Sequence, residues 1–238
     1  MFEIKIKTSK NQIALYNRCV LGVSLDSNNH RGDRLAALVE WANDNFKDCI
    51  VDLTDTLHRY NHMADLKLSE NDARLKAHIQ GDQWLQESYH ILSNFKIPYC
   101  ILRWDAWKYN HKFIRYLHMF ESAFAVDKNF REAVMYDVNL FLGRRKALGS
   151  PTTEQLCVTY LLEELAGQSL LYEQFPAAEI YPGKQQKSFG LVRAGKVPNV
   201  PTGLQNSCFV SLYLHDKSAG LFGSANDDAD FADLRKMG

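Results

Sequence analysis

Three short apolar runs, separated by segments of helical periodicity, constrain the fold of this chain more than any other feature. The runs lie at 13–25, 49–55 and 99–104. Their apolar and β-branched residues predict strands that are covered on both faces. Between them, apolar residues three and four positions apart predict a helix over 34–46, and a second helical stretch that begins near Asp55 or Ser69 and extends to Phe95. This alternation predicts an α/β fold with a parallel sheet and crossover helices.

The segments that follow are predicted to be mostly helical. Broad apolar faces predict helix from Asp105 to Lys146. A strong amphipathic helix is predicted over 152–175, with Thr152 or Thr153 as its N-cap. Residues 207–214 have the composition of a last strand.

Length and charge bound the class of protein. A chain of 238 residues suits one domain, predicted over 1–216, and the segment 217–238 is rich in Gly, Ser, Asp and Ala, which predicts a mobile tail. Lys and Arg together number 28, as do Asp and Glu, so the formal net charge is zero. Charge alone therefore does not indicate a nucleic-acid partner, although a local basic patch is enough to bind phosphates.

Cysteine and histidine usage argues against a metal site. The five cysteines are widely spaced and never form a CxxC pair, and Cys19, Cys49 and Cys100 sit in or beside apolar runs. This pattern predicts reduced, buried thiols in a cytoplasmic protein. His58 and His62 are four residues apart, but no third ligand stands in an obvious position. No apolar stretch approaches the roughly 18 residues of a spanning helix, so no membrane association is predicted.

The end of the first predicted strand carries a candidate nucleophile. Ser24 follows the strand closely and lies beside Gly22, and ligands of parallel sheets bind beyond the carboxyl ends of the strands. The surrounding sequence is not GxSxG, so this is not the nucleophile elbow of hydrolases. From its position alone, Ser24 is equally an ordinary turn serine.

A second candidate pair lies on the predicted helix 152–175. Tyr160 and Glu164 are four residues apart and therefore share one helix face, which is otherwise mostly apolar. A carboxylate on such a face is costly unless it is paired, so the two side chains can form a pocket for a cationic group such as a free amine. The alternative is that Glu163 and Glu164 both point to solvent at the helix edge.

Two further positions have a structural and a chemical interpretation. Tyr181 precedes a Pro-Gly turn and is either a packing tyrosine or a site residue. Asp52 and Asp55 end the second predicted strand and could act as ligands or as a carboxylate pair. Asp55, just before Thr56, is more simply a helix cap.

Basic residues cluster in one segment. Arg103, Lys108, Lys112 and Arg115 are interleaved with aromatic residues, which mildly favours contact with RNA or another partner. A solvated helix face explains the same pattern.

Four blocks in the right order resemble the cyclodipeptide synthase family. The blocks are LGVSLDSNNHRGDRLAALVEWA at 21–42, DLTDTLHRYN at 52–61, YLLEELA at 160–166 and IYPG at 180–183. The resemblance runs, with gaps, from about residue 13 to 213. Tyr181-Pro182 and Ser27 match the Tyr-Pro subfamily, since the other subfamily has Tyr-His and an Asn at these positions.

The resemblance implies a fold and a reaction. The fold is a Rossmann-like domain similar to the catalytic domain of class I tyrosyl- and tryptophanyl-tRNA synthetases, without an ATP site. Ser24 takes an aminoacyl group from one aminoacyl-tRNA, and a second aminoacyl-tRNA extends it to a dipeptidyl-enzyme. The free amine then closes a diketopiperazine, a product typical of secondary metabolism, so this is ping-pong covalent catalysis. Neither metal nor ATP is expected, and the resemblance favours a monomer.

It also implies roles for single residues. Tyr160 and Glu164 would hold the aminoacyl ammonium, and Tyr181 would position the intermediate and relay a proton. The residues expected at the substrate are Gly22, Val23, Ser27, Tyr160, Glu164, Tyr181 and Pro182. The helix after the second block, with Arg74 and Lys76, is less basic than the resemblance implies for the tRNA surface. Lys108, Lys112 and Arg115 are therefore added as tRNA-binding candidates.

Two other functions compete with this interpretation. A serine hydrolase or acyltransferase would need a histidine within hydrogen-bond reach of Ser24, and His30 is the nearest in sequence. A non-catalytic tRNA-binding module would keep its function in a Ser24→Ala variant.

Overall fold

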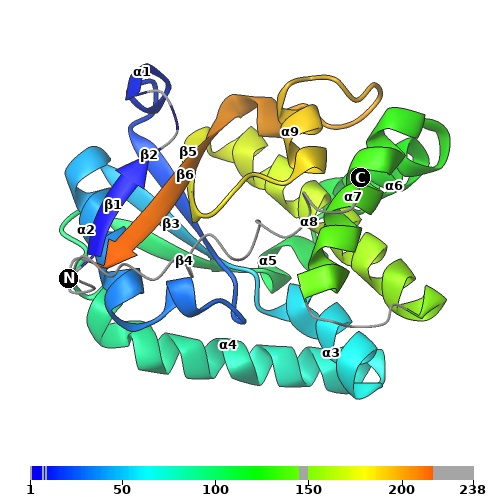
Figure 1. Ribbon diagram of the computed structural model, residues 1–238, viewed down its shortest axis with the longest axis horizontal. Helices are drawn as coiled ribbons and strands as arrows, with labels where there is room; N and C mark the ends of the chain where they lie inside the picture. The colour runs from blue at the N-terminus through cyan, green and yellow to red at the C-terminus, as the bar shows by residue number, and fades with distance from the viewer. Residues whose placement is uncertain (1, 7, 9, 145–149, 217–238) are drawn as a thin grey trace, which may run out of the picture.

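A single six-stranded sheet organises the protein (Figure 1). The computed structural model describes residues 2–6, 8, 10–144 and 150–216; the predicted tail lies outside them. The strands are β1 (Phe2–Ile6), β2 (Arg18–Val23), β3 (Asp48–Leu53), β4 (Tyr99–Arg103), β5 (Ala177–Pro182) and β6 (Ser207–Asp216). Their order is β1-β6-β5-β2-β3-β4, with every pair parallel except β1 and β6. The predicted α/β fold with a mostly parallel sheet is confirmed.

Helices cover both faces of the sheet. The described helices are α1 (Lys10–Ile13), α2 (Gly32–Asn45), α3 (Arg59–Leu66), α4 (Glu70–Leu92), α5 (Asp105–Lys108), α6 (His111–Val126), α7 (Lys128–Arg144), α8 (Pro151–Gln174) and α9 (Lys187–Arg193). Three short 3-10 turns are η1 (Asn28–His30), η2 (Thr56–His58) and η3 (Gly203–Asn206). Figure 1 shows α4 along the lower edge of the molecule and α6 to α9 in the right half of the view, with β1 at the left.

Strand periodicity divides the apolar core into two clusters. Leu21, Val51 and Ile180 point to the face that α2 and α4 cover, where Trp84 is fully buried. Val20 and Ile50 point to the other face and pack in a cluster with residues of α6 to α9. Because side chains alternate along a strand, Gly22 and Asp52 share the second face, which α8 covers.

Two strands are absent from the predictions. β1 is a short edge strand of alternating character, and β5 is a central strand between β2 and β6. The strand predicted over 13–25 is also shorter, because α1 and a turn precede β2. The central position of β5 places Tyr181 beside the end of β2, so the missed strand is the one that completes the site.

Two predicted helix caps and one predicted buried residue are wrong. Ser150, and not Thr152 or Thr153, caps α8, with its hydroxyl accepting from the Thr153 amide at 3.2 Å. Asp55 makes no capping hydrogen bond. Cys100 is exposed because β4 is an edge strand, whereas Cys19 and Cys49 are buried as predicted. All five cysteines are described and none forms a disulfide.

Candidate active site

Ser24 begins the loop that leaves the carboxyl end of β2 and is half-buried. The fully buried ring of His30 organises this loop, because its Nδ1 lies 3.0 Å from the Ser24 amide, which donates to it, and 3.2 Å from the Ser24 carbonyl. Burial lowers the pKa of His30 to about 4, so the ring is neutral at physiological pH. The contacts of His30 Nδ1 are thus with the Ser24 backbone.

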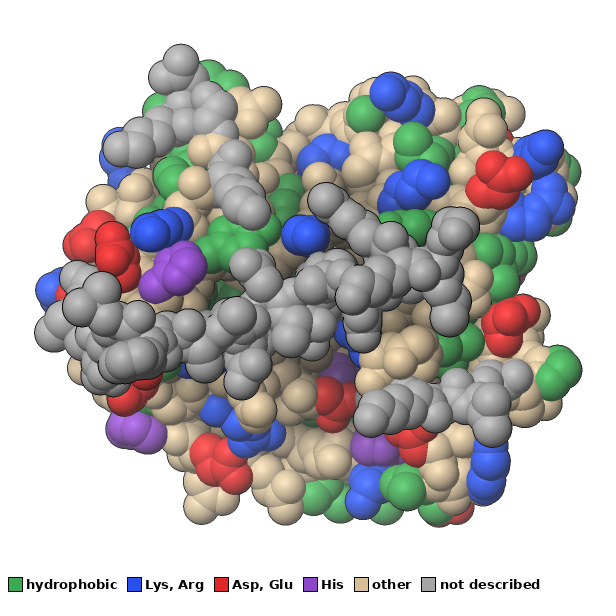
Figure 2. Space-filling model, viewed as in Figure 1, with side chains coloured by type: hydrophobic (Ala, Val, Ile, Leu, Met, Phe, Trp, Pro, Cys, Tyr) green, Lys and Arg blue, Asp and Glu red, His purple; other side chains and the backbone are tan. Residues whose placement is uncertain are grey.

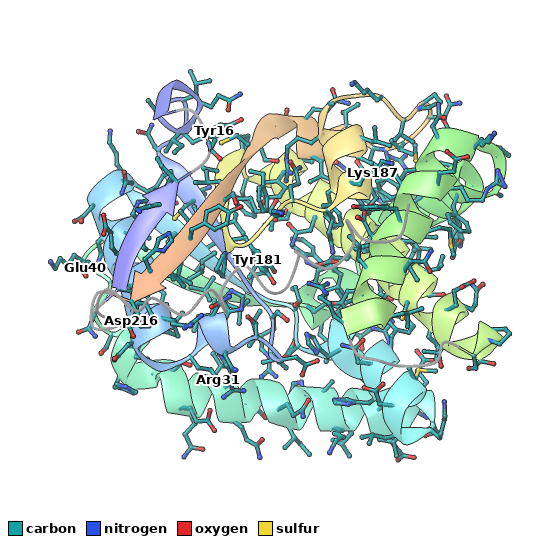
Figure 3. All side chains as sticks on the ribbon, viewed as in Figure 1. Tyr16, Arg31, Glu40, Tyr181, Lys187 and Asp216 are labelled. Carbon is teal, nitrogen blue, oxygen red and sulfur yellow. The ribbon has the colours of Figure 1, made fainter. Side chains whose placement is uncertain are left out.

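Tyr181 stands next to this loop, at the centre of the molecule (Figure 3). Its ring packs edge-on against His30, with 5.3 Å between ring centroids. A Cβ on Gly22 would lie 3.5 Å from the Tyr181 ring, an ordinary contact distance. Burial, and then the charge of Glu164, raise the pKa of Tyr181 to about 12, against a smaller lowering by a hydrogen bond with the Ser24 side chain. The side chains of Ser24 and Tyr181 are therefore close enough for Ser24 to affect the pKa of Tyr181.

Tyr160 and Glu164 approach the same region from α8. Tyr160 packs edge-on against His58 and Tyr60, at 6.2 and 6.4 Å between ring centroids. Burial, then the charges of Glu164 and Tyr181, raise the pKa of Tyr160. Oε2 of Glu164 is buried and has no hydrogen-bond partner among the described residues. Burial, followed by the charges of nearby carboxylates, raises the pKa of Glu164 to about 8.

Both carboxylate oxygens of Glu163, the neighbour of Glu164, accept hydrogen bonds. Its two oxygens accept from both terminal nitrogens of Arg59, at 3.0 and 2.5 Å. The Tyr60 hydroxyl at 2.6 Å and Trp104 Nε1 at 2.8 Å complete the set. The alternative in which Glu163 and Glu164 both point to solvent is therefore wrong, because the two side chains are drawn to two different buried environments.

Two aspartates at the end of β3 also differ from each other. Asp55 is buried and pairs with Arg103, at 2.5 Å, so it anchors β4 and does not cap a helix. Asp52 is fully buried, and its Oδ2 accepts from Gln168 Nε2 at 2.6 Å, while its Oδ1 has no partner among the described residues. Burial raises the pKa of Asp52 to about 7. Asp52 is thus a second carboxyl group on the face that holds Gly22.

The other residues expected at the substrate play local structural parts. Val23 is buried in the cluster on the opposite face, and its carbonyl accepts from the Thr54 hydroxyl at 2.9 Å. Pro182 is buried as well, at the end of β5. The Ser27 hydroxyl caps η1 by accepting from the Asn29 amide at 3.2 Å.

The tRNA-binding candidates lie on separate surfaces. Arg74 pairs with Asp105 at 2.7 Å, and Lys112 pairs with Glu173 at 2.8 Å. Lys76 and Arg115 are exposed, on α4 and α6 respectively, which Figure 1 shows well apart. The Lys108 side chain lies outside the described part of the structure. In Figure 2, basic and acidic side chains are interspersed over the described part of the visible face.

A shallow surface hollow lies on α4, away from Ser24. It is lined by Leu75, Lys76, Ile79 and polar neighbours on the same helix. Across the described ranges, no group of three or more His, Cys, Asp or Glu is arranged to hold a metal ion. No described helix has the length and hydrophobicity of a membrane span.

Sequence reasoning missed three contributors to the site. The sequence suggests His30 only as a base for Ser24, whereas in the structure it holds the loop. Gln168 lies four residues after Glu164 and so continues the Tyr160–Glu164 stripe, a spacing that could have indicated it. Arg59 holds Glu163 apart from Glu164, and no local pattern indicates this pair because its partners are 104 residues apart.

The fold is a mostly parallel α/β sheet with Ser24 and Tyr181 at the carboxyl ends of neighbouring strands, and the described part of β2 and its loop carries no glycine-rich phosphate loop. Residues 3–166 match the family model described as cyclodipeptide synthase. The chain therefore belongs to the cyclodipeptide synthase family. The prediction of a tRNA-dependent aminoacyltransferase is confirmed at this level.

Solved structures give the same fold. A cyclodipeptide synthase from Fluoribacter dumoffii is 22% identical, with a TM-score of 0.80 over 91% of this chain and 100% of that one. A Mycobacterium tuberculosis protein, described as showing that cyclodipeptide synthetases are related to type I tRNA synthetases, is 18% identical, with a TM-score of 0.69 over 90% and 94%.

A third relative is described with a bound ligand. The cyclodipeptide synthase from Candidatus Glomeribacter gigasporarum, bound to Phe-tRNA, is 21% identical, with a TM-score of 0.61 over 82% of this chain and 86% of that one. A comparison with curated protein sequences found no match.

Proposed function

We propose that this enzyme makes a cyclic dipeptide from two aminoacyl-tRNAs by ping-pong catalysis through Ser24. The observation that carries the proposal is the convergence of Ser24, the Tyr181 ring and the Tyr160–Glu164 pair at the carboxyl edge of the sheet. A nucleophile and an acceptor for an ammonium group stand together there, as a reaction between two aminoacyl groups requires. The relative bound to Phe-tRNA supports aminoacyl-tRNA as the substrate class.

The reaction has three acyl-transfer steps. Ser24 Oγ attacks the ester carbonyl of the first aminoacyl-tRNA, and the bond to the terminal ribose breaks as the serine proton passes to the ribose oxygen. The amine of the bound aminoacyl group attacks the ester of the second aminoacyl-tRNA, forming a peptide bond and releasing the second tRNA. The free amine of the dipeptidyl group then attacks the ester to Ser24, which closes the diketopiperazine and returns the proton to Oγ.

The buried carboxyl group of Glu164 is suited both to bind the aminoacyl ammonium and to accept its proton. Its unpartnered Oε2 can accept a hydrogen bond from the aminoacyl ammonium, together with the Tyr160 hydroxyl. A pKa of about 8 is close to that of an amine, so Glu164 can also take the proton that must leave before the amine attacks. Tyr181, whose side chain interacts with that of Ser24, is placed to pass a proton to or from Oγ as the substrate binds.

The remaining parts of the proposal follow from the chemistry of the substrate. An aminoacyl ester is already activated, so neither ATP nor a metal ion is needed. The Tyr181-Pro182 pair and Ser27 support the Tyr-Pro subfamily, which we propose for this chain. One chain supplies every side chain invoked above, which supports a monomer, and the aminoacyl-tRNA substrates support a location in the cytoplasm.

The hydrolase alternative receives less support. A hydrolytic serine needs a histidine base on its Oγ. His30 Nδ1 is occupied by the Ser24 backbone, and its lowered pKa makes the ring a weak base. We therefore favour a mechanism in which the leaving ribose, and not a histidine, accepts the serine proton.

The test is mass spectrometry of cyclic dipeptides formed by the purified chain and mixed aminoacyl-tRNAs. The Ser24→Ala variant is compared with Ser93→Ala, an exposed serine at the end of α4. We expect cyclic dipeptides from the wild type and from Ser93→Ala, and none from Ser24→Ala. Intact-protein mass of the wild type should rise by one aminoacyl group during turnover. Product formation by a folded Ser24→Ala variant would rule out the covalent route.

A further inference from the structure

The layer between α8 and the sheet holds more buried polar atoms than the proposed reaction uses. A helix that covers a parallel sheet normally presents apolar side chains to it. On α8, however, the polar stripe at four-residue spacing continues past Glu164 to Gln168 and Tyr172, both buried. Asp52 stands opposite on β3, in contact with Gln168.

These groups leave several acceptors without donors. The Gln168 amide nitrogen donates to Oδ2 of Asp52, and the remaining acceptors of this pair, Oε1 of Gln168 and Oδ1 of Asp52, have no partner among the described residues. Oε2 of Glu164, one helical turn away, is also buried without a partner among the described residues. Buried acceptors without partners cost about 1–3 kcal/mol each, so three in one layer indicate that a ligand supplies the donors.

The charge of the layer favours a cation. Asp52 and Glu164 are each affected by the charge of Glu179, and Asp52 also by Asp55. Glu179 is neutralised by Arg193, and Asp55 by Arg103. No cationic side chain in the described ranges makes an ion pair with Asp52 or Glu164. Burial raises the pKa of both groups, and a bound cation would restore their ionised forms.

The distance between Asp52 and Ser24 along the strands matches the length of an aminoacyl side chain. Asp52 is in register with Gly22, two residues before Ser24, and therefore lies about 7 Å below the Ser24 position along the strands. Val20 and Ile50, two residues further down, close the layer with buried apolar side chains. The α-ammonium of an aminoacyl group esterified to Ser24 would meet Glu164, whereas only an aminoacyl side chain of several atoms would reach Asp52.

We propose, on the basis of the proposed function, that Asp52 and Gln168 form the polar end of the pocket for one aminoacyl side chain, and that this side chain ends in hydrogen-bond donors, preferably a cation such as that of Lys, Arg or His. An apolar side chain would leave the acceptors unpaired, and sites built to pair with polar groups reject such analogues strongly. The second aminoacyl group is not constrained by these residues.

The experiment supplies the purified full-length chain with all twenty aminoacyl-tRNAs and identifies the cyclic dipeptides by mass spectrometry. Asp52→Leu removes the acceptors and keeps the branched shape of the side chain, and Asp52→Asn removes only the charge. Asp48→Asn, at the opposite end of the same strand, is the matched control, because Asp48 is partly exposed and pairs with Arg18. Circular dichroism and thermal melts check that each variant is folded.

We expect most wild-type product to contain Lys, Arg or His, or a side-chain amide as the weaker donor. Asp52→Leu should lower the share of these products at least tenfold in favour of apolar ones, and Asp48→Asn should leave the distribution unchanged. If Asp52→Leu does not fold, Asp52→Asn carries the test, because it should lower the cationic products relative to the amide-containing ones.

Two results would overturn the inference, and a third would overturn it together with its premise. Wild-type products built only from apolar amino acids, or an unchanged distribution in folded Asp52 variants, would show that the layer holds water and not substrate, while the synthase activity stands. If the wild type makes no cyclic dipeptide at all, the proposed function itself fails.

Discussion

Two adjacent glutamates on α8 occupy opposite situations. Glu163 is buried with donors from Arg59, Tyr60 and Trp104 on its two oxygens. Glu164 has a buried oxygen with no donor among the described residues. A carboxylate with a complete set of partners joins α3, α8 and the end of β4, and so supports the fold. A carboxylate that lacks them weakens the fold and is suited to a ligand.

The same contrast recurs at the end of β3. Asp55 pairs with Arg103 and also accepts from the Trp104 amide at 3.3 Å. Asp52 has one amide donor and a free buried oxygen. The satisfied groups lie towards α3, α4 and β4, and the unsatisfied ones lie between α8 and the sheet. These four buried carboxyl groups thus separate into a structural pair, Glu163 and Asp55, and a pair that we propose to face substrate, Glu164 and Asp52.

Removing the partner of a carboxyl group in the structural pair should give the largest effect. Arg59→Ala leaves Glu163 buried without its cation, so we expect the free energy of unfolding to fall by about 3–5 kcal/mol. Chemical denaturation measures this loss. Arg31→Ala is the matched control, because the Arg31–Glu87 pair is exposed and should contribute at most about 1 kcal/mol. Equal losses in the two variants would break the comparison.

Glu164→Gln should move stability and activity in opposite directions. Below pH 4.5 the carboxyl group is protonated in both folded and unfolded chains. Between pH 4.5 and about 8 the unfolded chain releases the proton and the folded chain keeps it, so the stability of the wild type falls as pH rises. A shift of this size corresponds to roughly 5 kcal/mol. Glutamine does not titrate, so the variant should lack this component of the loss.

The measurement for Glu164→Gln combines two readouts. Thermal melts from pH 4.5 to pH 8.5 should show the variant gaining stability relative to the wild type as pH rises. The rate of cyclic dipeptide formation should fall about 100-fold or more, because a neutral amide neither pairs with the ammonium nor takes its proton. A variant that loses both stability and activity would group Glu164 with the structural pair.

The sequence determines one half of the site better than the other. Ser24 follows from a strand end, and the shared face of Tyr160 and Glu164 follows from their spacing, because both are local patterns. The strand that positions Tyr181 is not evident in the sequence, because β5 begins just after Pro176, ends in a Pro-Gly turn and carries Glu179, whose charge is neutralised only by Arg193 in the fold. Local pattern cannot supply such a partner.

The same limit explains the aspartates. Asp55 resembles a helix cap in sequence, and only the fold brings Arg103, 48 residues away, onto its carboxylate. Asp52 and Gln168 are 116 residues apart, and a glutamine within a helix is predicted to face solvent. Which buried polar groups remain without partners is therefore a property of the three-dimensional structure, although each helix and strand involved is largely predictable.

The smallest predicted effects concern the surface cations, which also divide into those with and those without a carboxylate partner. Arg74 and Lys112 already pair with Asp105 and Glu173, whereas Lys76 and Arg115 form no ion pair with a carboxylate in the described ranges. A cation that is already paired must give up its partner before it binds phosphate, so it contributes less to tRNA affinity. We therefore expect Lys76→Ala or Arg115→Ala to raise the KM for aminoacyl-tRNA a few-fold. Each should also reduce the slope of log affinity against log salt by about one if its cation contacts a phosphate. Lys112→Ala should change both quantities less.

The measurement is the KM for aminoacyl-tRNA across a salt series, with kcat as the internal control. A larger effect from Lys112→Ala than from Lys76→Ala and Arg115→Ala would mean that the Lys112–Glu173 pair opens to bind tRNA, and the division between satisfied and unsatisfied groups would then not extend to the surface.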